Sequence, residues 1–99
     1  MQYLVAVFMA IATHHPAPDH VAQLEGHMNL VRDTVRAGAE GLVDFDCYRS
    51  EDGARLFGVS KWDSREAFEA AVPLLASSRK RRRDEWTIAD DELLTLESF

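Results

Sequence analysis

The sequence is poor in residues that cross-link a chain or bind metals. Its single cysteine, Cys47, cannot form an internal disulfide. Because Cys47 lies within a strand-like segment, we expect a buried structural thiol, with a reactive thiol as the alternative. The histidines are His14, His15, His20 and His27. On one helix His20 and His27 would be separated by a rise of about 10 Å, too far to share a small ion, so we expect no metal site.

Long apolar runs and a basic N-terminal segment are also missing. The longest apolar run, Tyr3 to Ala12, has about ten residues, whereas a membrane span needs roughly 20. The chain starts with Met1-Gln2-Tyr3 and carries no basic residue before this run, unlike a secretory signal peptide. We therefore expect a cytoplasmic protein without a membrane partner.

Positive charge is in deficit, with 11 Lys and Arg against 17 Asp and Glu and a net charge of −6. This balance argues against nucleic acid as a partner. The exception is Arg79 to Arg83, a run in which every residue is basic. Because a helix spreads such a run around its circumference, we expect a solvated surface. An anchor for an acidic substrate and a nucleic-acid contact are the alternatives.

The periodicity of apolar residues predicts the fold class. The 99 residues make a single domain, 1–99, with 46% hydrophobic and 28% charged residues, as in an ordinary globular protein. Segments rich in β-branched and aromatic residues, or alternating apolar and polar, are typical of strands. The expected strands are 3–12, 42–49, 55–62 and 92–99, and the apolar helical stripes cover 21–35 and 67–75. This order predicts an α+β, ferredoxin-like β-α-β-β-α-β domain, a four-stranded antiparallel sheet with its helices on one face.

Local signals predict where the helices begin and end. Asp19 is a candidate cap for the first helix, and Gly38 is a plausible stop. Asp63 to Glu66 has the form of a capping box for the second helix. Pro73 interrupts the second apolar stripe, so we expect a kink or a break there.

The predicted sheet has a second apolar face that needs a partner. If the turn pairs Cys47 with Phe57, the face under the helices carries Val43, Phe45, Cys47, Phe57 and Val59. The other face then carries Leu4, Ala6, Phe8, Leu42, Tyr48, Leu56 and Trp62 beside the polar Asp44, Asp46 and Ser60. An apolar patch of this size is unusual on a monomer. We therefore predict a homodimer in which two such faces pack with two-fold symmetry.

The segment from Ala39 to Ala71 carries a recognisable pattern. An acidic-Gly turn precedes a strand that ends in Tyr-Arg, a hairpin, and a second strand that ends in Trp. The residues of the pattern are Glu40-Gly41, Tyr48-Arg49, Trp62, Asp63-Ser64 and Phe68. The segment resembles the antibiotic biosynthesis monooxygenase family, one group of the dimeric α+β barrels.

The resemblance implies a homodimer with one pocket per subunit, between sheet and helices, for a small aromatic ligand. The best-known members of the family oxidise polycyclic phenols, anthrones or quinols with molecular oxygen and use no cofactor. The ionised substrate itself supplies the electrons, while the protein supplies orientation and charge stabilisation.

The resemblance also points to particular residues. In the best-known members the strand-end Trp, here Trp62, acts with an Asn four residues earlier, where this chain has Gly58. An arginine also takes part, for which Arg79 to Arg83 is the candidate run. A haem-degrading branch has an Asn at the position of Phe8 and a His after the Trp. Because no histidine follows Trp62 here, haem degradation is disfavoured.

These considerations give a set of candidate site residues. Trp62 is the expected stacking wall, with a role in the dimer core as the alternative. Asp44 and Asp46 would lie roughly 7 Å apart on one strand face and are candidates for the catalytic proton acceptor. Their alternative role is to keep an edge strand from aggregating. The expected substrate contacts are Tyr48, Ser60, Phe8 and Arg83.

Two functions are therefore open. The first is a cofactor-independent monooxygenase that acts on a small polycyclic phenol, anthrone or quinol. The second is a non-catalytic small-ligand-binding or stress-related module of the same fold. The feature that separates them is whether Asp44 and Asp46 line a closed pocket near Trp62.

Overall fold

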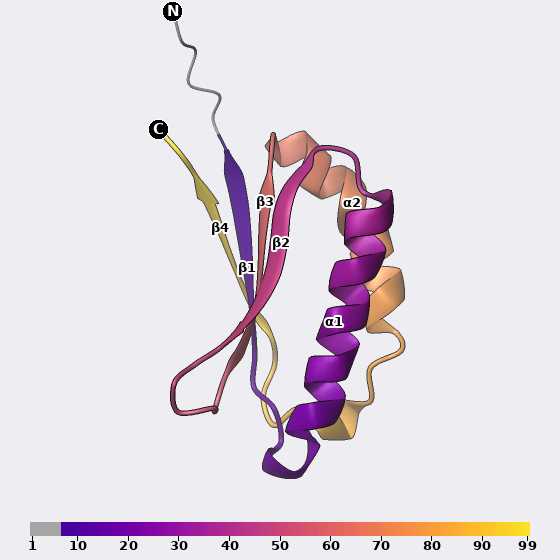
Figure 1. The fold of residues 1–99 in the computed structure, drawn as a ribbon, viewed down its shortest axis with the longest axis vertical. Helices are drawn as coiled ribbons and strands as arrows, with labels where there is room; N and C mark the ends of the chain where they lie inside the picture. Colours follow the sequence, from indigo (N-terminus) through magenta and orange to yellow (C-terminus); the bar gives the residue numbers. More distant parts are fainter. Residues whose placement is uncertain (1–6) are drawn as a thin grey trace, which may run out of the picture.

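The strands and helices follow the predicted order. The computed structural model describes residues 7–99. The strands are β1 (Phe8–His14), β2 (Leu42–Arg49), β3 (Leu56–Trp62) and β4 (Glu92–Glu97). The helices are α1 (Val21–Gly38) and α2 (Arg65–Arg79), with short 3-10 turns η1 (Pro18–His20) and η2 (Asp84–Trp86). Both helices cover the same side of the sheet, and no helix of residues 7–99 covers the other (Figure 1). The predicted ferredoxin-like α+β fold is confirmed.

The sheet is fully antiparallel, with the strand order β2-β3-β1-β4. β3 and β1 therefore each have a strand partner on both edges, and β2 and β4 are the edge strands. The predicted first strand began at residue 3, and its residues Leu4 and Ala6 lie outside the described part of the chain. Among the described residues, β1 begins at Phe8.

The register of the β2–β3 hairpin differs from the predicted one by a single residue. Cys47 pairs with Gly58 rather than with Phe57, and Phe45 pairs with Ser60. The turn decides this, because the Ser50 backbone N–H donates to the Arg55 carbonyl at 3.0 Å and residues 51–54 form the loop. The Ser50 hydroxyl also accepts from the Arg55 N–H at 3.0 Å.

A shift of one residue exchanges the two faces of β3. Leu56, Ser60 and Trp62 lie under the helices, and Phe57 and Val59 lie on the open face, so the predicted faces of β3 are wrong. Three further face assignments are also wrong. Phe8 is buried under the helices, and Leu42 packs against the core beside its strand partner Trp62. Val43 is 60% exposed at an irregularity between Leu42 and Asp44.

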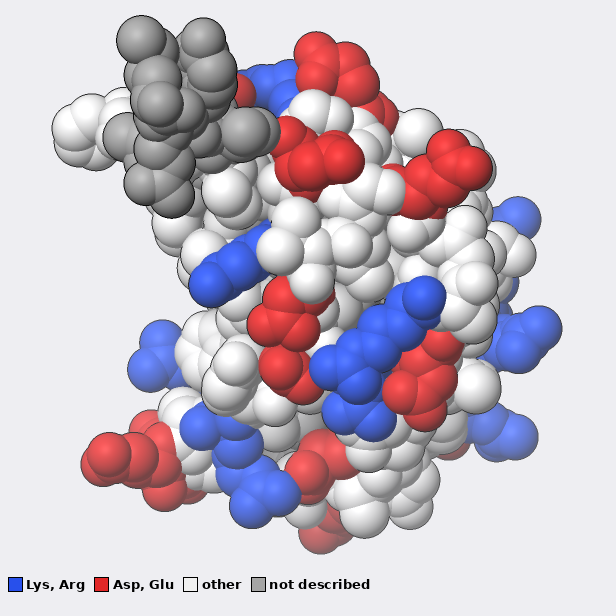
Figure 2. Space-filling model, turned by 45° about the horizontal axis from the view of Figure 1, so that its top comes forward, with Lys and Arg blue, Asp and Glu red and all other residues white. Residues whose placement is uncertain are grey.

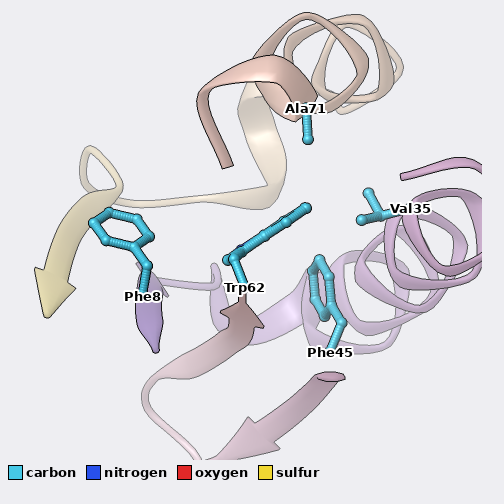
Figure 3. Close-up of a cluster of buried hydrophobic side chains, with 5 residues drawn as sticks. All are labelled: Phe8, Val35, Phe45, Trp62 and Ala71. Carbon is cyan, nitrogen blue, oxygen red and sulfur yellow. The ribbon is translucent and has the colours of Figure 1, made fainter. Parts of the chain in front are cut away.

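Large aromatic side chains fill one end of the space between sheet and helices. Phe8, Phe45 and Trp62 rise from three strands toward Val35 of α1 and Ala71 of α2 (Figure 3). Trp62 is fully buried. Full burial of one such side chain contributes about 1.5–3 kcal/mol, so this cluster anchors both helices to the sheet. A second cluster consists of Leu24, Met28 and Leu56.

Gly41 explains why the acidic-Gly turn of the sequence pattern precedes β2. Its φ of +79° belongs to the left-handed region, and an added Cβ would lie 2.6 Å from the Cβ of Ala67. The Gly41 carbonyl accepts the backbone N–H of Asp63 at 2.8 Å. A side chain at residue 41 would therefore push the turn away from the start of α2.

The helix ends differ in detail from those predicted. Ser64, rather than Asp63, caps α2 by accepting the Ala67 N–H at 3.1 Å. α2 runs through Pro73 without a break and ends at Arg79. Asp19 does not cap α1, because Pro18 starts a 3-10 turn that includes Asp19 and leaves His20 at the N-cap position.

Candidate functional site: a cavity between sheet and helices

A cavity of ≈ 360 Å³ lies between the sheet and the two helices. Its floor is made of small residues, Ala10, Ala12 and Gly58, whose short side chains leave space that the helices do not fill. The apolar walls are formed by Met28 and Val31 of α1, Phe45 and Cys47 of β2, and Phe68, Val72 and Leu75 of α2. The volume lies in the range of small-molecule sites, about 300–1,000 Å³.

One end of the cavity is charged. The Arg82 guanidinium donates to Asp91 Oδ2 at 2.6 Å, and His14 Nδ1 lies 3.0 Å from Asp91 Oδ1. Arg79 reaches the same carboxylate at 3.4 Å. The side chains of Arg82 and Asp91 are each only 12% exposed. Burial by itself would raise the pKa of Asp91, but the contacts with His14 and Arg82 outweigh it and lower this pKa to about 2.

Backbone hydrogen bonds bring this charged end together. The Ala17 N–H donates to the Trp86 carbonyl at 2.8 Å, and the Ile88 N–H donates to the His15 carbonyl at 2.9 Å. Pro16 and Thr87 form an isolated β-bridge. The segment after α2 is thereby tied to the end of β1, which places Arg82 and Asp91 beside His14.

His27 of α1 also lines the cavity. Its ring centroid lies 6.1 Å from that of Trp86, with the planes tilted by 60°. Burial lowers the pKa of His27 from its ordinary value of 6.5, and electrostatic interactions with Arg82, His14 and Arg81 lower it further. The imidazole is therefore neutral at pH 7.

Sequence reasoning missed His14 and His27 as site residues, although a signal for each was present. His14 alternates with Ala10 and Ala12 along β1, so all three side chains point to the same face. His27 follows the buried Leu24 by three residues and lies on the inner stripe of α1. Asp91 and Arg82 carried no comparable signal, because neither lies in a periodic element.

Among the predicted site residues, all of them within the described chain, Ser60 alone lines the cavity. Trp62 is fully buried, donates its Nε1–H to the Ser60 hydroxyl at 2.8 Å, and meets Phe68 edge-on at 5.8 Å. Phe8 is buried with its ring 5.3 Å from that of Phe68. The contacts of Trp62 and Phe8 are those of core residues, and their roles toward a substrate stay predictions.

The two candidate carboxylates lie on the edge strand β2, away from the cavity. Asp44 is exposed, and Asp46 accepts from the Arg36 guanidinium at 2.8 Å in a pair that is more than 40% exposed on each side. Tyr48 is 55% exposed and borders a second, shallow hollow of ≈ 130 Å³. Within one chain, therefore, the structure does not bring Asp44 and Asp46 to a closed pocket.

Arg82, rather than the predicted Arg83, lines the cavity. The Arg83 side chain is 74% exposed and lies 3.8 Å from Glu85. α2 ends at Arg79, and the turn that follows directs Arg82 back toward the sheet. Acidic and basic side chains are interspersed on the face shown in Figure 2, without a continuous basic surface there.

Cys47, predicted as a buried structural thiol, is half-buried and lines the cavity. Burial raises the pKa of its thiol. Within residues 7–99, no group of three or more His, Cys, Asp or Glu side chains is placed to hold a metal ion. None of the helices formed by these residues is long and apolar enough to cross a membrane.

Comparison with known proteins identifies the family. The model of the antibiotic biosynthesis monooxygenase family matches residues 7–73. The solved structure of Rv0793 from Mycobacterium tuberculosis is 23% identical, with a TM-score of 0.80, over 94% of this chain and 95% of that one. A candidate antibiotic biosynthesis monooxygenase from Nitrosomonas europaea is 13% identical, with a TM-score of 0.82, over 99% and 95% of the two chains.

The structure of PA3566 from Pseudomonas aeruginosa is 18% identical, with a TM-score of 0.80, and the match covers 99% of both chains. At these identities the solved structures establish the fold. No curated protein is significantly similar in sequence. The family match spans more than half of the sequence, including the acidic-Gly turn, both hairpin strands and most of α2. The chain belongs to the antibiotic biosynthesis monooxygenase family.

Proposed function

We propose that the chain is a cofactor-independent monooxygenase that oxidises a small, flat, oxygenated aromatic compound, such as an anthrone or a quinol, with molecular oxygen. The observation that carries the proposal is the cavity of ≈ 360 Å³, apolar along its walls and charged at one end. Family membership favours an oxidation, and the cavity supplies a place for a substrate that brings its own electrons.

Each part of the cavity suits one part of such a substrate. The apolar side chains of Val31, Phe68 and Leu75 exclude water from the aromatic rings. The small floor residues Ala12 and Gly58 leave room for a planar molecule against the sheet. A ring oxygen directed to the charged end would meet Arg82, whose positive charge stabilises an anion in a largely buried setting.

The reaction is balanced without a further reductant. Loss of one proton turns an anthrone into an electron-rich enolate, which reduces molecular oxygen. One oxygen atom forms the new carbonyl at the ring methylene carbon, and the other leaves as water with the two methylene hydrogens. The protein's part is to hold the ring, to stabilise the enolate oxygen and to exclude competing solvent.

The second candidate function is a non-catalytic module that binds the same class of ligand. Two observations favour it: the candidate proton acceptors Asp44 and Asp46 do not line the cavity, and on its floor Gly58 stands where the family pattern has an amide side chain. The Ser60 hydroxyl is already engaged, since it accepts from Trp62 at 2.8 Å and faces the Ala10 carbonyl at 3.4 Å. A substrate would therefore find few free hydrogen-bond donors there.

We further propose that two copies pair through the open face of the sheet. Met9, Ile11, Phe57 and Val59 lie on this face by strand alternation, since their neighbours in β1 and β3 are the residues under the helices. β4 adds Leu94 and Leu96, which are 55% and 44% exposed in the single chain. Because these side chains are apolar, the surface can pack against the same surface of a second copy. Pairing about a two-fold axis would remove a large apolar patch from water.

Oxygen uptake tests the proposed activity. Metal- and flavin-free protein is mixed with anthrone or with substituted hydroquinones, and uptake is compared with that of buffer alone. Arg82→Met should lower turnover by about a hundredfold, as expected for loss of a group that stabilises an oxyanion. Arg83→Met, on the adjacent exposed arginine, is the matched control and should leave turnover unchanged. Uptake no faster than in buffer, together with tight binding of anthrone, would favour the binding module.

A further inference from the structure

We propose that His27 is the proton acceptor of this site. Its imidazole would take a proton from the ring methylene carbon of an anthrone, or from a phenolic hydroxyl, while Arg82 faces the oxyanion that forms. This inference rests on the proposed function, because it assigns the first chemical step of the oxidation to a residue outside the predicted site.

The position of His27 is well fixed. On α1 it is flanked by Leu24 and Met28, which are 0% and 6% exposed and anchor the helix to the sheet. Met28 and Val31 line the same cavity as His27. On its other side the imidazole meets the ring of Trp86 at 6.1 Å. These contacts hold the imidazole at the cavity wall instead of leaving it free in solvent.

The charges around His27 favour its neutral form, which is the form that accepts a proton. The groups that face it are His14 from β1, Arg81 and Arg82 from the segment after α2, and Asp91 from the segment before β4. Burial and the positive groups lower the pKa of His27, and Asp91 opposes them with a smaller effect. At pH 7 the imidazole therefore has an unprotonated nitrogen.

The other cavity-lining groups that could accept a proton are less suitable. Asp91, with a pKa of about 2, is too weak a base, and its carboxylate is already engaged by Arg82 and His14. The Glu92 carboxylate is 73% exposed and faces His15, 3.5 Å away. His14 is itself held against Asp91. Cys47 also lines the cavity, but burial raises the pKa of its thiol from 9.0, so it holds its proton at pH 7. Among the cavity-lining residues that the structure describes, His27 is thus the best placed base.

The proposed step conserves atoms and charge. The carbon–hydrogen bond of the ring methylene breaks, and the proton forms an N–H bond on the His27 imidazole. The electron pair stays on the substrate as an enolate, whose oxygen faces Arg82. The site then holds an imidazolium and an enolate, and its net charge is unchanged. His27 returns its proton to solvent or to the departing water after the enolate has reacted with oxygen.

Hydrogen exchange without oxygen isolates this step. Under anaerobic conditions, the methylene hydrogens of anthrone exchange with solvent deuterium slowly in buffer alone, and the protein accelerates this exchange only if it removes and returns a proton. NMR follows the loss of their signal with and without protein. His27→Gln should slow the protein-catalysed exchange by about 10²–10⁴-fold, the usual contribution of a general base. His15→Gln is the matched control, because His15 lies outside the cavity lining. With this variant, anthrone should exchange at the wild-type rate.

The pH dependence supplies a readout that does not require a variant. In the wild type the exchange rate should rise with pH and level off once His27 is neutral, at a midpoint below 6.5 because the pKa of His27 is lowered. This midpoint should coincide with the titration of the His27 ring signals in NMR. If the two midpoints differ, another group is the base and the inference is overturned, even where His27→Gln fails to fold.

The failure of this inference is distinguishable from that of the oxidation. Fast exchange without oxygen uptake would retain His27 as a base and refute the monooxygenase. Unchanged exchange in His27→Gln, with normal oxygen uptake, would refute the role of His27 and retain the oxidation. An absence of protein-catalysed exchange in the wild type would overturn the inference outright.

Discussion

The ion pair at the end of the cavity predicts a specific loss of stability when Asp91 is replaced by Asn. The pKa of Asp91 is lowered from 3.8 to about 2 in the folded protein, so folding favours its ionised form. At about 1.4 kcal/mol for each pKa unit, the ionised carboxylate contributes about 2 kcal/mol. Removing it also leaves the Arg82 side chain, 12% exposed, without this carboxylate.

We therefore expect Asp91→Asn to lower the free energy of unfolding by about 2 to 4 kcal/mol at pH 7. A domain of this size has a total stability of about 5–15 kcal/mol, so the variant should still fold. The neighbouring Asp90 is exposed, and Asp90→Asn is the matched control. Urea unfolding, at one fixed protein concentration, measures all three proteins.

The pH dependence of this loss has a defined sign. Because the folded-state pKa lies below the unfolded-state value of 3.8, the contribution of Asp91 is fully present above pH 3.8. It is lost as the pH falls from 3.8 toward 2, so wild type and Asp91→Asn should converge over that interval. The reasoning is refuted if Asp91→Asn and Asp90→Asn are equally stable at pH 7, or if the difference does not change down to pH 2.

Three further predictions concern the fold and its assembly. Gly41→Ala should destabilise the protein by about 2 kcal/mol or more, because its Cβ would lie 2.6 Å from the Cβ of Ala67. Gly53→Ala should cost only about 1 kcal/mol, since its φ is also positive but its Cβ would meet nothing within 4 Å. Urea unfolding measures both changes. Val59→Glu, on the open face, should yield a monomer in sedimentation equilibrium. Leu30→Glu, on α1, is the control and should leave the association state unchanged. If Val59→Glu associates as the wild type does, the proposed pairing is contradicted. Pro73→Ala should raise the free energy of unfolding by up to about 3 kcal/mol, as α2 continues through this residue.

Strand periodicity carried most of the fold information in the sequence. Alternation from Leu42 to Arg49 gave the bounds of β2 as the structure has them, and Trp62 marked the end of β3. The hairpin register was less predictable, because an Asp-Gly pair is compatible with loops of different lengths. The hydrogen bonds of Ser50 with Arg55 select the four-residue loop, and a sequence pattern does not encode that choice.

The site was harder to predict than the fold because its charged end is assembled from distant segments. Ser60 was a predicted contact, but on the other face of β3, and it lines the cavity because the hairpin register differs by one residue. Arg82 and Asp91 meet His14 only after the backbone from Trp86 to Ile88 pairs with residues 15–17. In a run of consecutive basic residues, the one that turns inward depends on where α2 ends, and the sequence pattern does not distinguish Arg82 from Arg83.

The central claim is that the cavity between sheet and helices binds the aromatic ligand. Ala12 lies on the cavity floor, and Ala12→Leu would place three further carbons there. Ile11→Leu is the control, because it conserves side-chain volume on the open face of the same strand. Isothermal titration with anthraquinone, which cannot be oxidised further at the ring, measures binding alone. We predict that Ala12→Leu raises the Kd by about tenfold or more, while Ile11→Leu binds as the wild type does. Wild-type affinity in a folded Ala12→Leu variant would contradict the account.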